Sequence, residues 1–475
     1  MRQKVSVAII GAGSAGLSAL RQVRRYTDSF VMINDGPLGT KCARVGCMPS
    51  KAIIQIARDY HRRHVLPSEG ILGGDSLRAD IPAVMRHVRS LRDQFADGMA
   101  STTEELAGDK LITGKAEITS PNSLRVGKIE IESEKIIIAT GAPPKVPDAW
   151  KSLGNRILTS ETIFEQDDLP GRIAVIGLGP IGLELGQSLS RLGIEVTGFD
   201  RGEFLGTITD PDVNAAAVRI LRREFPIHLR AGVDLQDDGH SLTVKHPELE
   251  VTVDSVIVAT GIRPAVQGLG LENLGVRLDE SGVPPFDPNT MQIGDLPVFI
   301  AGDVNGCRPI LHEALDEGFI AGSNSSSGKI ERYCRRSPLA LTFCDPEIAV
   351  VGQAHEQLAL SKRPFVIGKV DFSQQSRAML EARDRGLLHV YIDDETGEIL
   401  GAELVCSGGE HLAQQLALAI QQRMSLLDVL QMPFYHPTIE EALRTALQDA
   451  AKQLSSEYRS RALSLCGSCP ESPLC

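Results

Sequence analysis

Two copies of one short pattern, an apolar strand followed by a glycine-rich turn and a helix, constrain the fold of this 475-residue chain more than any other feature. The first copy reads VSVAIIGAGSAGLSAL, and the second reads RIAVIGLGPIGLELG. The apolar, β-branched run predicts a buried parallel strand, and the residues after the glycines predict a helix. A G-x-G-x-x-G turn in this setting is typical of a dinucleotide-binding site.

The three glycines of each turn are expected to act differently. The first permits the tight turn, the second lets the backbone approach the pyrophosphate, and the third lets the helix pack closely on the strand. The helix N-terminus adds amide donors and positive potential. One such turn is a weak signal, but two in one chain predict two bound dinucleotides and electron transfer between them. The glycines are Gly11, Gly13 and Gly16 in the first turn and Gly177, Gly179 and Gly182 in the second.

Length and composition set bounds that agree with this interpretation. A chain of 475 residues is expected to hold roughly three domains. Its hydrophobic content of 42% supports sizeable cores, and its net charge of −12 argues against a nucleic-acid or anionic-membrane partner. No apolar stretch of the sequence is long enough to span a bilayer.

The N-terminus and the cysteine content bear on the compartment. Arg2 and Lys4, followed by the first apolar pattern, imitate a secretory signal. Cleavage there would delete the first glycine turn, so we expect these residues to form the first strand and helix of the mature fold. Nine cysteines in a chain of this size are not a disulfide scaffold, so we expect a cytoplasmic protein with one catalytic disulfide.

Cys42 and Cys47 lie in the segment GPLGTKCARVGCMPSK, beyond the first glycine turn. A C-x4-C pair close to a dinucleotide-binding turn suggests a redox disulfide beside a redox cofactor. Two buried thiols, or half of a metal site, are the alternatives that the spacing alone leaves open.

Motifs along most of the chain carry a family resemblance. They are GAGSAG, C-x4-C-x-PSK, IIIATGAPP, GLGPIGLELG, VIVATGIRP, FIAGDVNG, FCDPEIAVVG and YHPTIEEAL. From the Gly11 turn to about Ala450 the chain resembles the pyridine nucleotide–disulfide oxidoreductases, especially dihydrolipoamide dehydrogenase and its relatives glutathione reductase and mercuric reductase. The resemblance implies an α/β fold with two Rossmann-like dinucleotide-binding domains, for FAD and NAD, and an α+β C-terminal dimerisation domain.

The order of these motifs predicts the domain organisation. The FAD-binding domain begins with residues 1–148, the NAD-binding domain follows at 149–270, and residues 271–338 return to the FAD-binding fold as its central part. Residues 339–460 resemble the interface domain through which the family forms homodimers. Residues 461–475 are a cysteine-containing C-terminal tail.

The resemblance assigns the redox chemistry to Cys42 and Cys47. Cys42 would exchange with the substrate disulfide, and Cys47 would lie against the flavin as the charge-transfer thiolate. The segment after Cys42 is expected to open a helix that carries both cysteines. Because a helix N-terminus stabilises a thiolate, the pKa of the thiol should be lowered there.

Lys51, in CMPSK, would lie beside the flavin and pair with Glu184 of the second turn. A buried cation there would stabilise the reduced, anionic flavin, and it needs a carboxylate to offset its own desolvation. A solvated lysine on a helix is the alternative.

His436 in YHPTIEEAL is the candidate acid–base, with Glu441 as its carboxylate partner. A thiol must lose a proton to attack and regain it on release, which suits a histidine of near-neutral pKa. The carboxylate would orient the ring and stabilise the imidazolium. A structural histidine before a proline turn is the alternative. In the family this histidine completes the site of the other subunit, which predicts an inactive monomer.

The resemblance also implies cofactor contacts. Asp303 in FIAGDVNG would bond the ribityl chain of FAD. Asp200 ends the strand after the second turn, where a carboxylate bonds the ribose hydroxyls of NAD and repels a 2′-phosphate, although Arg201 beside it could serve such a phosphate. No metal ligand is assigned. The full set is Gly11, Gly13, Ser14, Ala15, Gly16, Asn34, Asp35, Thr40, Lys51, Ala116, Thr140, Gly141, Asp303 and Leu311 for FAD, and Gly177, Gly179, Gly182, Asp200, Val233, Gly261 and Arg263 for NAD.

Several positions depart from the family pattern. Asn34 stands for the usual acidic residue after the second strand, and its side chain can still bond the adenosine ribose. Asp35 beside it is the alternative, although strand alternation would aim it elsewhere. Lys41 and Arg44 flank Cys42, where they would lower the pKa of the exchange thiol and attract an anionic substrate or acidic carrier. Side chains at a solvent-facing rim are the alternative.

The tail cysteines Cys466, Cys469 and Cys475 fall outside the family pattern. An extra redox pair, half of a metal site and plain thiols all stay open for them.

The sequence therefore predicts a homodimeric FAD-dependent dithiol–disulfide oxidoreductase. Dihydrolipoyl groups on a carrier protein would reduce the Cys42–Cys47 disulfide, and the electrons would pass through FAD to NAD⁺. Two alternatives remain: an NAD(P)H-dependent reductase of a small disulfide, and a non-enzymatic flavoprotein whose disulfide acts as a redox sensor. No nucleic-acid or membrane partner is expected.

Overall fold

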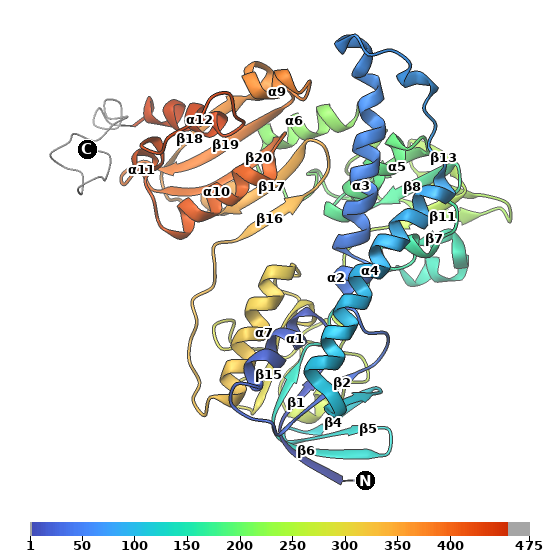
Figure 1. The fold of residues 1–475 in the computed structure, drawn as a ribbon, viewed down its shortest axis with the longest axis vertical. Coiled ribbons are helices and arrows are strands. Elements are labelled where there is room, and N and C mark those ends of the chain that lie inside the picture. The colour runs from blue at the N-terminus through green and yellow to red at the C-terminus, as the bar shows by residue number, and fades with distance from the viewer. Residues whose placement is uncertain (1, 455–475) are drawn as a thin grey trace. The chain divides into compact units, whose positions relative to one another are not determined.

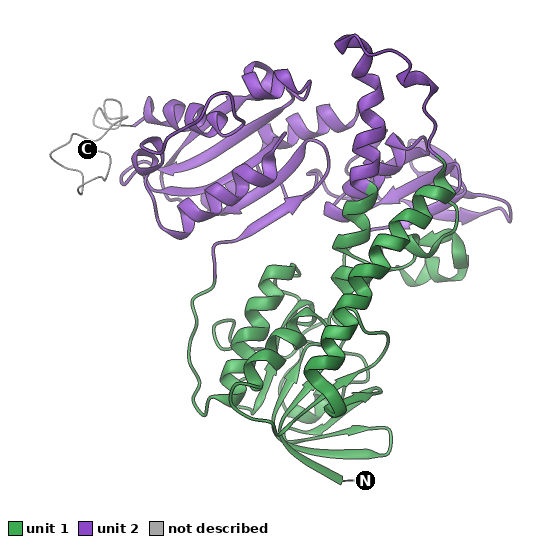
Figure 2. Cartoon of the chain, viewed as in Figure 1, with its two compact units in different colours: residues 1–53, 80–169, 260–335 green, residues 54–79, 170–259, 336–475 purple. Residues whose placement is uncertain are grey.

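The computed structural model describes residues 2–454. The chain divides into two compact units, shown in green and purple in Figure 2. Unit 1 contains the residues up to 53 together with 80–169 and 260–335. Unit 2 contains residues 54–79, 170–259 and the chain from 336 onward. Each unit holds one of the two glycine turns, and the chain enters each unit three times.

Unit 1 is built on a seven-stranded sheet whose main path is β3-β2-β1-β6-β5-β4, with β15 paired to β6 (Figure 1). The strands β3, β2, β1, β6 and β15 run parallel, whereas β4 and β5 add antiparallel edges. Ile136 and Ile138 of β6 pack into one apolar core and Ile137 into another, as expected for a strand covered on both faces. The bounds are β1 Arg2–Ile10, β2 Phe30–Asn34, β3 Leu111–Thr113, β4 Ala116–Ser120, β5 Ser123–Val126, β6 Ile129–Ile138 and β15 Val298–Ile300. The short strand β7 (Ile157–Leu158) is not part of this sheet.

Two helices of unit 1 lie directly on each other, α1 (Ser14–Val23) and α7 (Leu311–Ser326). A Cβ on Gly318 would lie 2.2 Å from the carbonyl oxygen of Ala15, and one on Gly322 would lie 2.5 Å from that of Ala19. Glycine on α7 thus lets the backbones touch, which fixes α1 against β1 and β6. The other helices are α2 (Lys41–Arg44), α3 (Cys47–His61), which crosses the unit boundary, and α4 (Ile81–Ala107).

The second dinucleotide fold of the chain lies in unit 2 and contains the parallel strands β10-β9-β8-β14. The helices α5 (Pro180–Arg191) and α6 (Pro211–Leu221) accompany them. A small antiparallel sheet of β11, β12 and β13 is inserted before β14. The bounds are β8 Arg172–Ile176, β9 Glu195–Phe199, β10 Ile227–His228, β11 Asp234–Asp237, β12 Leu242–His246, β13 Leu249–Val253 and β14 Ser255–Val258.

The C-terminal part of unit 2 is an antiparallel sheet of order β16-β17-β20-β19-β18. Leu388, Val390 and Ile392 of β19 pack into an aliphatic core with helices α10, α11 and α12. The bounds are β16 Leu339–Thr342, β17 Glu347–Gly352, β18 Phe365–Asp371, β19 Gly386–Asp393, β20 Ile399–Cys406, α8 His355–Ser361, α9 Ser376–Leu380, α10 Gly409–Gln421, α11 Leu426–Leu430 and α12 Glu441–Ala451.

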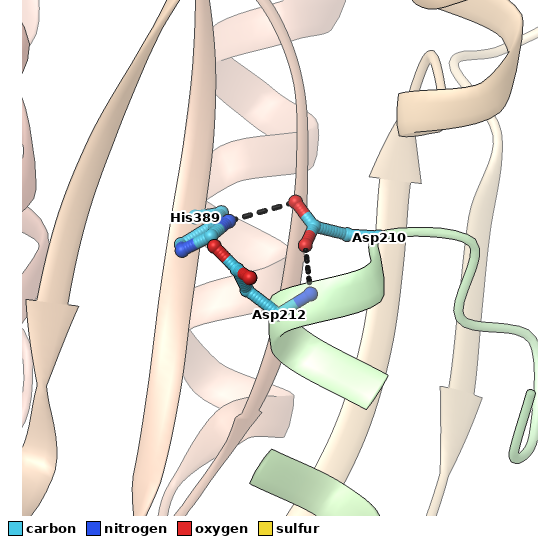
Figure 3. Close-up of side chains that lie close together, drawn as sticks. All are labelled: Asp210, Asp212 and His389. Carbon is cyan, nitrogen blue, oxygen red and sulfur yellow. Dashed lines mark hydrogen bonds and ion pairs between the residues drawn. The ribbon is translucent and has the colours of Figure 1, made fainter. Parts of the chain in front are cut away.

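The opposite face of β19 carries polar side chains that anchor α6 (Figure 3). Asp210 is the N-cap of α6: its Oδ1 accepts the amides of Asp212 at 2.9 Å and Val213 at 3.2 Å. Its Oδ2 lies 2.7 Å from Nδ1 of His389 and accepts the hydroxyl of Tyr391 at 3.0 Å. Burial alone would raise the pKa of Asp210, but these hydrogen bonds outweigh it and lower the pKa to about 2.

The donor atoms of Asp210, Asp212 and His389 lie within 4.8 Å of one another, as a cation site would require. Both oxygens of Asp210 are already bonded, however, and Asp212 pairs with Lys369 Nζ at 3.2 Å. This arrangement favours an anchor between α6 and the sheet over a metal site.

Replacing Asp210 is expected to destabilise unit 2. Asp210→Ala removes both the helix cap and the partner of buried His389, and should cost about 2–4 kcal/mol. Asp210→Asn keeps a capping oxygen but loses the charge, so its thermal midpoint should lie between those of Asp210→Ala and wild type. Because the pKa of Asp210 is lowered on folding, its contribution is full above the unfolded pKa of about 4 and is lost as the pH falls towards 2. Equal midpoints for both variants at pH 7 would contradict the anchoring role.

Candidate active site

The first glycine turn joins β1 to α1 and leaves open space at one position. A Cβ on Gly11 would lie 2.2 Å from the carbonyl oxygen of Ala139, and one on Gly16 would lie 1.9 Å from that of Gly11. The fold itself therefore requires these two glycines. A Cβ on Gly13 would meet no atom within 4 Å, and α1 begins with the next residue, Ser14. The turn thus has the free approach and the helix N-terminus that a pyrophosphate needs.

The second glycine turn repeats this geometry between β8 and α5. A Cβ on Gly182 would lie 1.8 Å from the carbonyl oxygen of Gly177, whereas one on Gly179 would meet nothing within 4 Å. α5 begins at Pro180. Both turns therefore fit a bound dinucleotide by the same test, although they are unrelated in their other side chains.

The two turns also share a side-chain contact. The amide of Ala12, between the first two glycines, donates to Asn34 Oδ1 at 3.1 Å. The amide of Leu178, at the corresponding place, donates to Asp200 Oδ2 at 2.5 Å. Asn34 thus occupies in the first fold the position that Asp200 occupies in the second, at the end of the adjoining strand, while Asp35 is exposed.

The segments that leave the two dinucleotide folds pair with each other in unit 1. Thr140 Oγ1 donates to the carbonyl of Ala265 at 2.9 Å, and the amide of Ala265 donates to the carbonyl of Gly141 at 2.9 Å. Gly141 and Gly261 have φ of 72° and 100°, which favours glycine. Arg263 lies in the same ribbon. Thr140, Gly141, Gly261 and Arg263, assigned from sequence to two cofactors, are thus brought together.

Asp303 follows β15 in a loop that is hydrogen-bonded to α7. Glu317 Oε2 accepts the amide of Gly302 and the side-chain amide of Asn305, both at 2.7 Å. Burial raises the pKa of Asp303, and the positive charge of Lys41 opposes this effect. The loop therefore holds a half-buried carboxyl group in unit 1, as a hydrogen-bonding partner for a flavin side chain requires.

Three of the predicted cofactor contacts, Ala116, Val233 and Leu311, differ in how exposed they are. Ala116 and Val233 are 3% and 6% exposed as whole residues, so both present little surface to a cofactor. Leu311, the first residue of α7, is 41% exposed.

Cys42 and Cys47 lie on two helices rather than one. Cys42 is in α2, and Cys47 is the first residue of α3. The expectation of a single helix is wrong because Val45 leaves helical geometry, with φ −136° and ψ 4°. Gly46 then turns the chain so tightly that a Cβ would lie 3.2 Å from the Cα of Cys42.

The two thiols are within hydrogen-bonding reach of each other in their reduced form. The hydrogen bond from Cys42 to Cys47, followed by burial and the charge of Cys47, raises the pKa of Cys42; Lys51 opposes this more weakly. The expected lowering of the Cys42 pKa is therefore wrong for the dithiol. The proton therefore stays on Cys42, which donates to Cys47 at the start of α3.

Lys41 is neither a free cation beside the thiol nor part of an open rim. Its ammonium donates to the carbonyl oxygen of Ala142 and pairs with Glu161 Oε1 at 3.1 Å. The Lys41 side chain is about one-third exposed. Lys41 thus ties the cysteine segment to the exit ribbon next to Gly141, and its charge is matched by a carboxylate.

Lys51 and Glu184 belong to different units, so their ion pair stays a prediction. Lys51 Nζ lies 3.5 Å from Ser50 Oγ. Glu184 is buried and its Oε1 accepts the amide of Phe343 at 2.9 Å.

His436 and Glu441 form the predicted dyad in unit 2. His436 Nδ1 lies 2.9 Å from Glu441 Oε2, which also accepts the amide of Thr438 at 3.3 Å. The histidine side chain is 71% exposed and the carboxylate only 13%. A third member was missed from the sequence: Arg444 donates to Glu441 Oε1 at 2.9 Å. The signal for it was present, because Glu441 and Arg444 are three residues apart on a helix.

The predicted residues thus gather in two places. Unit 1 brings together the first glycine turn, the cysteine pair, Thr140 and Asp303, and unit 2 brings together the second turn and Asp200. The dyad lies in the C-terminal part of unit 2. Cys466, Cys469 and Cys475 lie outside the described residues.

Comparison with known proteins decides the family. The profile described as pyridine nucleotide-disulphide oxidoreductase matches residues 5–318, and that of the dimerisation domain of the same family matches residues 339–447. The chain belongs to this family. The predicted fold class is thereby confirmed, and membership implies FAD and a pyridine nucleotide as cofactors. The dimerisation domain supports a homodimer.

Curated relatives match this chain over most of its length. A dihydrolipoyl dehydrogenase of Trypanosoma brucei brucei is 30% identical over 461 residues, covering 93% of this chain and 95% of that protein. The mitochondrial dihydrolipoyl dehydrogenase of Mus musculus is 29% identical, covering 94% of this chain and 91% of its own.

Solved structures agree in fold. LpdA from Mycobacterium tuberculosis superposes with a TM-score of 0.81 at 21% identity, covering 95% of this chain and all of that chain. The Cu(II) complex of RclA from Escherichia coli, described as an HOCl-induced flavoprotein disulfide reductase, superposes with a TM-score of 0.80 at 22% identity, covering 94% and 99%. Among residues 2–454, no helix has the length and apolar character needed to cross a membrane.

The open space at Gly179 leads to a first prediction for the site. Gly179→Ala should leave the thermal midpoint nearly unchanged, because the added Cβ meets no protein atom. It should weaken pyridine-nucleotide binding at least about tenfold, because the methyl group occupies the approach of the pyrophosphate. Gly182→Ala is the matched contrast and should lower the midpoint, since its Cβ would clash with Gly177. Unchanged nucleotide affinity in Gly179→Ala, measured by titration, would contradict this assignment.

A second prediction concerns Lys41. Because Glu161 already matches its charge, Lys41→Met should change the pKa of the reactive thiol by less than about 0.3 unit. The measurement is the pH dependence of iodoacetamide reaction with the reduced protein. A rise of a full unit would show instead that the ammonium acts directly on the thiol, as the sequence pattern suggests.

Proposed function

We propose that this protein is a dihydrolipoyl dehydrogenase-like enzyme that oxidises dihydrolipoyl groups on a carrier protein through a Cys42–Cys47 disulfide, with FAD as cofactor and NAD⁺ as acceptor. The observation that carries the proposal is the thiol pair in hydrogen-bonding reach at the start of α3, in the same unit as the open first glycine turn. The names of the relatives at 29–30% identity support the substrate class.

The thiol chemistry is a double exchange. One thiolate of the substrate attacks the sulfur of Cys42 in the disulfide, so that a mixed disulfide forms and Cys47 leaves as a thiolate. The second substrate thiol then attacks the substrate sulfur of this mixed disulfide and releases Cys42. Two electrons thereby pass from the substrate dithiol to the cysteine pair. Residues of the first glycine turn and Asp303 would hold FAD, which would supply the two-electron redox chemistry that links the cysteine pair to the pyridine nucleotide.

The reduced pair is poised for the second half of this cycle. The hydrogen bond to Cys47 keeps the proton on Cys42, and we assign the negative charge of the pair to Cys47 at the helix N-terminus. This asymmetry supports the roles of Cys42 as the exchange thiol and Cys47 as the thiolate beside the flavin. Lys51 and Asp303 complete the proposed flavin environment, and Glu184 is the ion-pair partner that we propose for Lys51.

His436 supplies the acid–base function in this proposal. It takes the proton of the attacking substrate thiol and returns it on release, with Glu441 holding Nδ1 so that Nε2 is free for the thiol. The histidine is 71% exposed on its own chain, which suits a group that serves another subunit. The active site of one subunit is therefore completed by His436 of the partner subunit.

We propose NAD(H) rather than NADP(H) as the nucleotide. Asp200 Oδ2 and Oδ1 accept the amides of Leu178 and Gly202 at 2.5 and 2.7 Å. These bonds hold a carboxylate at the end of β9, where it would accept the ribose hydroxyls and repel a 2′-phosphate. Arg201 follows directly and is exposed.

The competing reaction runs from a reduced nucleotide to a small disulfide. RclA, which shares this fold, is described as a flavoprotein disulfide reductase. The same cysteine pair would serve both directions, so the substrate has to be tested.

The decisive assay combines NAD⁺ with free dihydrolipoamide and then with a lipoylated carrier protein. We expect turnover with both and a much higher specificity constant for NAD⁺ than for NADP⁺. Cys42→Ser should abolish turnover while anaerobic NADH still reduces the flavin. Turnover only in the direction of a small disulfide would replace the substrate class. A flavin that does not exchange electrons with the disulfide would instead support a redox sensor.

A further inference from the structure

The carboxylate of the dyad bonds two side chains, one on each oxygen. Glu441 directs Oε2 to His436 Nδ1 at 2.9 Å and Oε1 to Arg444 Nη2 at 2.9 Å. The amide of Thr438 shares Oε2 at 3.3 Å. Both oxygens of one carboxylate are therefore assigned to separate partners, and rotation of the carboxylate would break both contacts at once.

Arg444 is itself held in place by its surroundings. It stands on α12 three residues after Glu441, on the same side of the helix. Its guanidinium lies over the ring of Phe434, 5.7 Å from the centroid. The loop between Phe434 and α12 is held by a further hydrogen bond, in which the Gln375 side chain donates to the carbonyl of Thr438 at 2.6 Å.

The charges around the dyad act in opposite directions. Burial alone would raise the pKa of Glu441, but the amide of Thr438, His436 and Arg444 together lower it. In general a carboxylate beside an imidazole favours its charged form, and a guanidinium bonded to the same carboxylate opposes it. Arg444 is the third ionisable side chain at the dyad. Among residues 2–454, it is the charged side chain recorded in contact with Glu441 or His436, apart from these two themselves.

We propose that Arg444 is a positioning residue of the acid–base dyad, which fixes the carboxylate of Glu441 towards His436 and holds the proton affinity of His436 below the value that Glu441 alone would give. The inference rests on the proposed function for its catalytic meaning, but its physical content concerns His436 itself. The role would matter because a base that exchanges protons with a thiol must release them as readily as it takes them.

The first test measures the pKa of His436 directly. In full-length protein with ¹³C-labelled histidine, the His436 signal is assigned by its loss in His436→Gln and titrated by NMR. Arg444→Met should raise the pKa of His436 by roughly half a pH unit, because a nearby positive charge is removed. Glu441→Gln should lower this pKa, because the carboxylate no longer stabilises the imidazolium. General loosening of the loop would not move the two variants in opposite directions.

Two further variants complete the experiment. Arg444→Lys keeps the charge and should restore most of the wild-type pKa. Arg423→Met removes another exposed arginine that pairs with a glutamate, Glu398, and should leave the pKa of His436 unchanged. An unchanged or lowered pKa in folded Arg444→Met would overturn the proposal, as would an equal rise in Arg423→Met.

The kinetic readout separates this inference from the proposed function. With dihydrolipoamide and NAD⁺ as substrates, the acid limb of the pH profile of kcat/KM should move to higher pH in Arg444→Met, by the same amount as the NMR pKa of His436. If no variant or wild type turns over dihydrolipoamide, the proposed function fails while the NMR result still decides the role of Arg444. If wild type is active and the acid limb does not move with the NMR pKa, Arg444 does not act through the catalytic histidine.

Discussion

The lack of space for a side chain at the third glycine of each turn determines how the helix packs on the strand in both dinucleotide folds. At Gly16 and Gly182 the helix backbone lies so close to the turn that no side chain fits, which fixes the helix on its strand. The amides at the helix N-terminus then face the open space beside Gly13 or Gly179. In unit 1, Asn34, Thr140 and Asp303 lie at the same edge of the sheet, because they come at the carboxyl ends of β2, β6 and β15. One backbone contact, used twice, therefore sets where each cofactor can bind.

Short-range patterns made much of this predictable. The strand–turn–helix order, the C-x4-C segment and the HPT-E motif each depend on residues a few positions apart, and their spacing carries the geometry directly. His436 and Glu441 are five residues apart across the start of α12, and because this separation is short their side chains can bond. Fold class and family follow from the order of such motifs, and the comparisons confirm them.

Contacts between distant segments were not predictable from the sequence. Lys41 looked like a cation beside Cys42, but its partners Ala142 and Glu161 lie over a hundred residues away in sequence. The break between α2 and α3 depends on local packing at Gly46 that propensity does not report. The sign of the Cys42 pKa shift was missed for a related reason: the hydrogen bond to Cys47 outweighs the helix N-terminus.

Strand β19 has a consequence for how the C-terminal sheet forms. Leu388 and Val390 face the aliphatic core with α10 and α12, whereas His389 and Tyr391 bond Asp210 on the α6 side. A slip of one residue in the pairing of β19 would place an imidazole and a phenol in the aliphatic core and leave Asp210 facing hydrocarbon. Wrong registers are thus penalised on both faces, so folding of this sheet selects its pairing without help from the turns at its ends.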